Sequence, residues 1–484
     1  MSSAESAAPA PLENRITDFS SRFSPVLVKE LRQGMRTNLF VIAFILLQTF
    51  MMLCLIAGIA DPGSRDADGF FWFFIIATLL VVQPLRGFAA LSSEYQMNTM
   101  DLIQLTRLNG WRITLGKWTA LNAQGLLFLT GVLPYLVIRY YLGNVNFVSD
   151  LLALGAIGLG SGLMTAITIG SSVFKNIVLR GLLLATLFFF AASISSVLTF
   201  TVFGTRGRGF QPEMAALFAL IATYGIIFFL SFGASRISPL SENLATRKRV
   251  IAIAFVLIAQ LFHFAGASEE VFVVTCIILG LALIDALTEP LPIFSRVLAP
   301  FRERPLGNLA ALFLSPGWIS GLAFFAISAG LLFGSLLLGN SGVSGPDFSN
   351  TGDVVLFLSM CNVILFPLLI IHLFFSGHGS HHFTFGVYIF IQGGLFVLTL
   401  MIVAIGNALS EHEDLIYLCT PLPSVLIYAE NEAGADTLLH LGIAIVTTLL
   451  CVAFPLLRQR KKVREFYATL KFTPLKNASP AEGN

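Results

Sequence analysis

The residues that come nearest to a nucleotide-binding pattern are Gly110, Gly116 and Lys117. An ATPase loop of the form Gly-x4-Gly-Lys-[Ser/Thr] surrounds phosphates with its backbone N–H groups and its lysine. In this chain five residues separate the two glycines, and Trp118 stands where the motif requires a hydroxyl. The stretch also precedes an apolar run, whereas the motif follows a strand. We therefore predict that ATP is not bound by this chain.

Other residue types that could bind a metal or attack a substrate are sparse. The segment 377–382 (Gly-His-Gly-Ser-His-His) has no nearby Cys or acidic residue to complete a ligand set, so we interpret it as a solvated loop. The five cysteines are irregularly spaced, which favours buried apolar roles over disulfides or zinc ligands. The zinc-protease motif His-Glu-x-x-His and the Gly-x-Ser-x-Gly elbow do not occur. The sequence predicts no metal site and no catalytic residue.

Charged residues within the apolar runs are the remaining candidates, because each costs about 2.5–3.5 kcal/mol at a bilayer centre. Asp285 and Glu289 lie near the inner end of one predicted span, and Arg139 lies near the outer end of another. We expect all three side chains to reach the membrane interface. His263 and His372 lie deeper, but no ladder of acidic residues accompanies them. The sequence therefore does not predict a proton or sodium relay.

Composition sets the class of protein in which these residues must be placed. Of the 484 residues, 56% are apolar and only 12% are charged, which is about half the charged share of an ordinary soluble domain. Such a chain cannot cover a soluble globule with charge, and its apolar content excludes general disorder. No basic patch interleaved with aromatic residues indicates nucleic-acid binding. The composition predicts an all-α, polytopic membrane helix bundle.

Twelve apolar runs are long enough to span a bilayer, whose core of about 30 Å requires roughly 20 helical residues. Only Ser268, Glu269 and Glu270 separate the seventh and eighth runs, for which we favour a tight hairpin of spans over a shorter re-entrant pair. The first run follows a stretch of mixed charge, so no cleavable signal peptide is expected. The predicted spans are 38–60, 70–90, 118–142, 150–173, 181–203, 213–234, 250–267, 271–289, 316–338, 353–375, 384–406 and 437–457.

Lysine and arginine predict the orientation of these spans, since they are enriched in cytoplasmic loops. If the N-terminus is cytoplasmic and the twelve spans alternate, 25 of the 29 Lys and Arg residues fall on the cytoplasmic side. Both termini are therefore expected in the cytoplasm, in a multi-pass protein of the plasma (inner) membrane of a bacterium. The expected regions are a cytoplasmic N-terminus (1–37), a first transmembrane region (38–289), a second transmembrane region (290–457) and a basic cytoplasmic tail (458–484).

Two segments on the predicted cytoplasmic side have amphipathic helical patterns. In residues 20–36 apolar residues recur every four positions and charged residues cover the remaining faces. This pattern predicts an interface helix on the inner membrane surface, and a general basic anchor for the first span is the alternative. The residues expected to form this helix surface are Leu27, Lys29, Glu30, Leu31 and Arg32.

The second amphipathic segment is the loop 91–117, in which Leu102, Leu105 and Leu108 are spaced by three among polar residues. This spacing predicts a short helix that projects from the membrane. Its apolar ridge needs a partner, which is either the bilayer surface or another protein. An ordinary helix within a surface loop is the alternative.

Residues 20–140 resemble the start of ABC-2 type transporter permeases. The resemblance is carried by Ser-Ser-Glu at 92–94, Asn-Thr-Met-Asp-Leu-Ile-Gln-Leu-Thr at 98–106, Trp-Arg-Ile-Thr-Leu-Gly-Lys at 111–117 and Ser-Pro-Val-Leu-Val-Lys-Glu-Leu-Arg at 24–32. Asn98 and Arg107 depart from the Gly and Pro that are usual in the family, so the helix is expected to continue past Thr106. The family core has six spans, so the second half is either a diverged permease unit or an accessory bundle.

The resemblance implies a permease subunit that moves a substrate by means of ATP hydrolysis in a separate ATP-binding subunit, which would hold ATP and Mg²⁺. It also implies that segment 91–117 is a coupling helix that docks on that subunit, and that the permease works as a homodimer or heterodimer. The alternatives are a twelve-span secondary transporter and a membrane scaffold without transport. The residues assigned to coupling are Glu94, Thr99, Asp101, Leu102, Leu105, Thr106, Arg107, Leu108, Arg112, Gly116 and Lys117.

Overall fold

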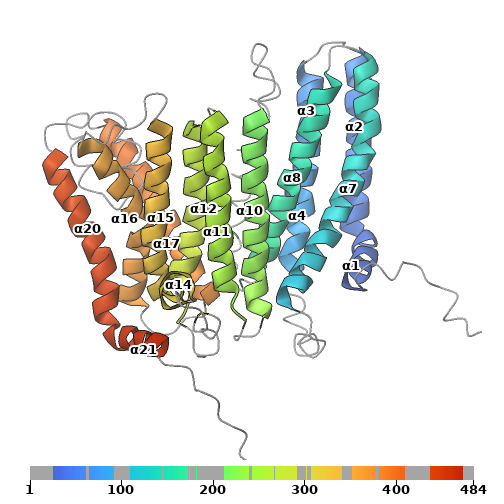
Figure 1. Ribbon diagram of the computed structural model, residues 1–484. Helices are drawn as coiled ribbons and strands as arrows, with labels where there is room; N and C mark the ends of the chain where they lie inside the picture. The colour runs from blue at the N-terminus through green and yellow to red at the C-terminus, as the bar shows by residue number, and fades with distance from the viewer. Residues whose placement is uncertain are drawn as a thin grey trace, which may run out of the picture. The chain divides into compact units, whose positions relative to one another are not determined.

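The computed structural model is helical throughout the part of the chain that it describes and contains no strand there (Figure 1). The chain divides into two compact units, Met1–Ile169 (unit 1) and Gly170–Asn484 (unit 2). A helix pairs its own N–H and C=O groups, which is what a segment surrounded by lipid requires. The described residues are 25–60, 65–91, 109–142, 146–172, 174, 181, 212–238, 242–265, 268–291, 301, 307–340, 351–375, 381–408 and 437–471.

Nine helices in the described ranges are long and apolar enough to cross a membrane, which confirms a polytopic helical membrane protein. Of the other predicted spans, 181–203 lies outside the described residues apart from Gly181. The predicted span 250–267 corresponds to α11 (Leu244–Gln260) followed by the 3-10 helix η4 (Leu261–Ala265). The predicted span 384–406 corresponds to α17 (His381–Ala408), of which Phe383–Leu398 is a shorter apolar stretch.

Unit 1 contains a short N-terminal helix and four candidate spans. The short helix α1 packs on α7, and α2 packs on both α3 and α7. Their shared core includes Leu47, Met51, Ile75 and Phe128, all at most 1% exposed. The helices are α1 (Pro25–Met35), α2 (Asn38–Ala60), α3 (Arg65–Ile76), α7 (Gly110–Leu142) and α8 (Phe147–Ser171).

The second span of unit 1 ends in an irregular helix. After α3 the chain forms the π-helix η2 (Ala77–Val82), the short α4 (Gln83–Leu85) and the 3-10 helix η3 (Arg86–Ala89). Pro84 contributes to this irregularity, because it has no N–H to donate to the preceding turn. The change in helix type places Arg86 at the end of the span, where it bonds to Gly34 of α1 and Gln124 of α7.

Unit 2 is arranged around α12, which packs against α10, α11, α15, α16 and α17. A second strong contact joins α16 to α20 (Figure 1). The predicted boundary near residue 289 falls inside this unit, at the end of α12. The helices not yet given are α10 (Pro212–Ile237), α12 (Ser268–Thr288), α14 (Gly307–Leu314), α15 (Trp318–Asn340), α16 (Thr351–Phe374), α20 (Thr437–Arg458) and α21 (Arg460–Lys471).

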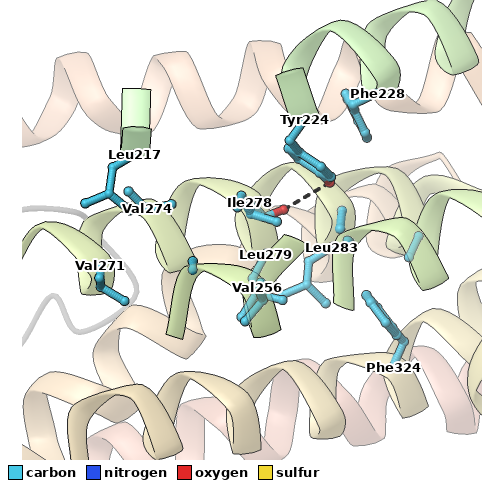
Figure 2. Close-up of a cluster of buried hydrophobic side chains, with 14 residues drawn as sticks. Leu217, Tyr224, Phe228, Val256, Val271, Val274, Ile278, Leu279, Leu283 and Phe324 are labelled. Atoms are coloured by element: carbon cyan, nitrogen blue, oxygen red, sulfur yellow. Dashed lines mark hydrogen bonds between the residues drawn. The ribbon is translucent and has the colours of Figure 1, made fainter. Parts of the chain in front are cut away.

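An extensive apolar core of unit 2 lies between α10, α11, α12 and α15 (Figure 2). Val256, Ile278 and Phe324 are completely buried in it. The Tyr224 hydroxyl also lies in this core and donates to the Ile278 carbonyl oxygen at 3.2 Å, so the ring is buried without leaving its polar atom unpaired. Gly321 of α15 faces the backbone of α12 so closely that a Cβ atom would overlap Ala286. This close approach brings the ends of α12 and α15 together at the site described below.

Candidate functional site

Most of the sequence-predicted coupling residues lie outside the described part of the chain, and three lie on α7. Arg112 is exposed, Gly116 is half-buried and Lys117 is only 4% exposed. The coupling residues outside the described ranges are Glu94, Thr99, Asp101, Leu102, Leu105, Thr106, Arg107 and Leu108.

The helix predicted within residues 20–36 is present as α1, and an ion pair joins it to α7. The Lys117 ammonium group lies 3.0 Å from the Glu30 carboxylate of α1. Leu27 and Leu31 are half-buried, whereas Lys29 and Arg32 are exposed. The described part of this helix therefore has the amphipathic character that the sequence predicts. The pairing of Glu30 with Lys117 also joins two of the predicted site regions.

A second set of contacts with α1 comes from Arg86, which was not among the residues predicted to be functional. Its guanidinium group donates to the Gly34 carbonyl oxygen at 2.8 Å, to the Thr37 hydroxyl at 3.2 Å and to the Gln124 side-chain oxygen of α7. A Cβ atom on Gly34 would overlap the amide of the Gln124 side chain, which would then have to shift. The only sequence signal for Arg86 was its basic character at the inner end of a span.

These contacts secure the chain on both sides of the loop 92–108. Arg86 lies five residues before Leu91, the last described residue before the loop, and Lys117 lies in α7 beyond it. Both residues bond to the segment formed by α1 and Thr37. Glu30, Gly34, Arg86, Lys117 and Gln124 are called the coupling base below.

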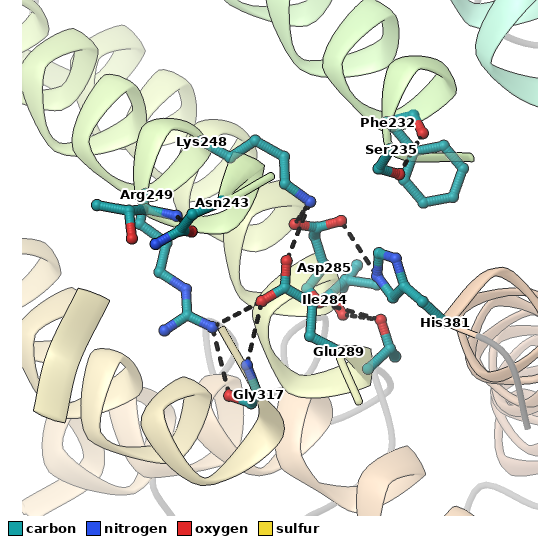
Figure 3. A network of polar contacts seen from close by, with 12 residues as sticks. Phe232, Ser235, Asn243, Lys248, Arg249, Ile284, Asp285, Glu289, Gly317 and His381 are labelled. Carbon is teal, nitrogen blue, oxygen red and sulfur yellow. Dashed lines mark hydrogen bonds and ion pairs between the residues drawn. The ribbon is translucent and has the colours of Figure 1, made fainter. Parts of the chain in front are cut away.

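A second polar centre lies in unit 2, where two cations and two carboxylates are buried side by side (Figure 3). Lys248 pairs with Asp285 and lies 3.1 Å from a Glu289 oxygen. Arg249 lies 3.0 Å from the other Glu289 oxygen. All four side chains are at most 7% exposed. The two positive charges therefore balance the two negative charges away from solvent.

His381 and α15 complete this ion cluster, which we define as Lys248, Arg249, Asp285, Glu289 and His381. The His381 Nε2 atom lies 3.4 Å from an Asp285 oxygen, and its side chain is 11% exposed. Interpreting segment 377–382 as a solvated loop is therefore wrong for His381, because this residue begins α17 and packs on α12.

The α15 side of the ion cluster is formed around Arg249. Its guanidinium group donates to the Ser320 hydroxyl at 2.7 Å and to the Phe313 carbonyl oxygen at 2.9 Å. The cluster thus binds the ends of α11, α12, α15 and α17 together.

Local sequence features place each member of the ion cluster. The Asn243 side chain accepts from the Thr246 N–H at 3.1 Å and caps α11, so the two cations lie in its early turns. Asp285 and Glu289 are four residues apart, which puts both carboxylates on one face at the end of α12. Gly317 has a φ of 119°, a conformation that favours glycine. It lets the Gly317 N–H face Glu289 while its carbonyl oxygen faces Arg249.

The chemistry open to the ion cluster is limited by its charge balance. The ligand atoms of Asp285, Glu289 and His381 lie within 4.8 Å of one another, a spacing that would suit a metal ion. However, Lys248 and Arg249 already neutralise both carboxylates, so a divalent cation would add uncompensated positive charge. We therefore assign no metal here and describe the cluster as a charge-balanced set of ion pairs that connects helix ends.

The other intramembrane polar residues expected from the sequence also have specific partners. Arg139 lies 3.7 Å from Asp150 and 4.3 Å from the centre of the Phe71 ring, and its side chain is buried within the protein. The charges of Asp285 and Glu289 are likewise paired inside unit 2. Sequence reasoning missed these pairs because each joins residues from different helices.

Comparison with known proteins finds no matching family model, no significantly similar curated protein and no significantly similar solved structure.

Proposed function

We propose that this chain is the membrane subunit of an ATP-driven transporter, and that a separate ATP-binding subunit acts on it through the segment 91–117. The resemblance of residues 20–140 to ABC-2 type permeases suggests this role. The observation that best supports it is the coupling base, in which Arg86 and Lys117 bond to α1 and Thr37 on either side of the loop. A loop held in this way suits the transfer of force better than a loop attached only at its two ends.

Energetics support a mechanical role for the coupling base. The side chains of Lys117 and Glu30 are 5% and 25% exposed, so their ion pair is shielded from most of the solvent. Arg86 adds hydrogen bonds from a charged donor, each worth about 1.5–3 kcal/mol. These contacts would favour movement of α1 and α7 as one body when a partner pushes on the loop.

In this proposal the partner subunit binds ATP and Mg²⁺, and this chain contributes no catalytic residue. The complex lies in the plasma membrane of a bacterium with both termini of this chain in the cytoplasm. The permease pairs with a second copy of itself or with a related chain. Membrane lipid covers the exposed apolar faces, such as Leu46, Leu53 and Ile56 of α2.

Loss of the apolar ridge tests the docking surface. We expect the double substitution Leu102→Asp and Leu105→Asp to abolish co-purification of an ATP-binding subunit while membrane insertion is unchanged, because charge would replace the apolar contact. Affinity isolation of the tagged full chain from native membranes measures the partner. Leu309→Asp on α14 is the matched control, since Leu309 is 59% exposed in unit 2 and belongs to no proposed docking surface. Equal recovery of the partner with the ridge variant and the control would contradict the proposal.

A twelve-span secondary transporter is the second candidate, and one observation favours it. Asp285, Glu289 and His381 lie together inside unit 2 with ligand atoms within 4.8 Å of one another, although the sequence alone suggested no relay. The same isolation experiment separates the two candidates, because a secondary transporter would be recovered without any nucleotide-binding chain. A scaffold would also be recovered without one, but it would give no substrate-driven uptake in proteoliposomes.

A further inference from the structure

The last two helices of unit 2 meet at a sharp corner. α20 ends at Arg458, and after Gln459 the chain turns into α21, which lies across the direction of α20 (Figure 1). The Gln459 amide lies 2.7 Å from the His372 Nδ1 atom of α16. The His372 ring in turn lies 4.7 Å from the centre of the Trp318 ring of α15. The corner is therefore held in place by two neighbouring helices.

The apolar side of α21 is already covered by protein. Phe466 is 4% exposed and packs with Trp318, Ile319 and Ala311, and Val463 adds to this contact. α21 consequently cannot use this face to insert into a membrane. The packing instead fixes which side of α21 remains available to other molecules.

The available side of α21 is strongly basic. Its four exposed cations form no ion pair within the described part of the chain, and Glu465 is the one acidic residue of the helix. So many unpaired like charges repel one another and favour a polyanionic ligand. The four cations are Arg460, Lys461, Lys462 and Arg464.

An apolar strip on α20 leads directly to these cations. Val446, Leu449, Leu450 and Leu457 are each 56–71% exposed, which in a membrane-spanning helix indicates contact with lipid tails. The strip ends next to Arg458, one residue before the corner. Lipid molecules lying along α20 would therefore place their headgroups at the first turn of α21.

We propose that the corner of α20 and α21 binds an anionic phospholipid, with its phosphate against Arg460 and Lys461 and its acyl chains along the α20 strip. An acidic protein would complement the charge but leave the continuous apolar strip unused. A neutral lipid would use the strip but leave the cations without counterions. Only an anionic lipid satisfies both halves of the surface, and juxtamembrane basic clusters have this affinity in general.

The experiment compares lipid binding by the purified full-length protein in neutral detergent. Phosphatidylglycerol and phosphatidylcholine with identical acyl chains are added, and retained lipid is counted by native mass spectrometry. We expect the wild type to prefer phosphatidylglycerol by about tenfold, because several cations contribute. We expect R460Q/K461Q/K462Q/R464Q to lose that preference, whereas the charge-conserving R460K/R464K keeps it. An unchanged preference in the quadruple variant would overturn the proposal.

Two further measurements keep the test decisive. If the quadruple variant does not fold, the wild-type preference is measured by fluorescent-lipid binding from about 0.05 M to about 0.5 M salt, a range over which screening of exposed charges increases strongly. We expect affinity for phosphatidylglycerol to fall with salt, and a salt-independent affinity contradicts the proposal. If the quadruple variant keeps its lipid preference and loses a co-purifying protein, the basic side binds protein and the proposal is wrong.

Discussion

At the scale of single residues, the ion cluster of unit 2 is the feature with the largest energetic consequence. A buried ion pair adds little net stability, because desolvation offsets the attraction, but an unpaired buried charge is costly. Lys248 contacts both carboxylates, so its removal weakens the neutralisation of Asp285 and Glu289 together. The cluster therefore fixes which helix ends are neighbours more than it raises total stability.

Removing Lys248 tests this view. We expect Lys248→Met to lower the free energy of unfolding by about 3–5 kcal/mol, because Asp285 and Glu289 then share one fewer cation. The double variant Lys248→Met with Asp285→Leu should recover most of that loss, since it removes one charge of each sign. Chemical unfolding in detergent, followed by circular dichroism, measures both.

Lys461→Met is the matched control for this experiment, because Lys461 is exposed and its loss should change stability by no more than about 0.5 kcal/mol. If Lys248→Met is as stable as the control, the buried cluster does not hold the helix ends. If the double variant is less stable than the single variant, the pairing of Lys248 with Asp285 is not the relevant interaction.

Part of this ion cluster can be predicted from the sequence. The expected hairpin of 250–267 and 271–289 brings residues 248–249 and 285–289 to the same end, and the spacing of Asp285 and Glu289 puts both acids on one face. The participation of His381 could not be foreseen, because it depends on α17 packing against α12. Residue type and spacing predict which groups share a helix face, but not which distant helix meets that face.

At the scale of elements, the coupling base joins α1, η3 and α7 through the side chains of Arg86 and Lys117. The span 38–60 was predicted with the bounds of α2, because an apolar run ends where polar residues begin. By contrast, α11 begins at Leu244, before the predicted residue 250, because the charges of Lys248 and Arg249 are paired inside the bundle and do not end the helix. The ion pair between α1 and α7 could not be predicted from the sequence, since Glu30 and Lys117 are 87 positions apart.

Gly34 offers a test of the close approach in the coupling base. We expect Gly34→Leu to destabilise unit 1 by about 1–3 kcal/mol, because the added side chain overlaps Gln124 and displaces α1 from α7. Gly58→Leu on α2 is the matched control, since a Cβ atom at Gly58 meets nothing within 4 Å. Thermal unfolding in detergent measures both variants, and equal unfolding temperatures would show that α1 is not held tightly.

At the scale of the whole molecule, composition alone predicted an all-helical, polytopic membrane protein, and the described residues confirm it with nine candidate spans. The count of twelve transmembrane spans and the cytoplasmic placement of the two termini remain predictions. The function also stays a proposal, because the segment that would contact an ATPase, residues 92–108, lies outside the described residues. Arg86 and Lys117 flank that segment, and both bond to α1. These contacts connect the fold to the proposed function.

The central claim is that the ridge of segment 91–117 contacts a nucleotide-binding subunit in the cytoplasm. A photo-crosslinking amino acid placed at position 105 of the full-length chain in native membranes tests this contact directly, with position 309 of α14 as the control. We predict a cross-linked product from position 105 that contains a protein with a phosphate-binding Gly-x4-Gly-Lys-[Ser/Thr] motif, and no such product from position 309. Cross-links from position 105 to lipid alone, or its accessibility only from outside the cell, would contradict the account.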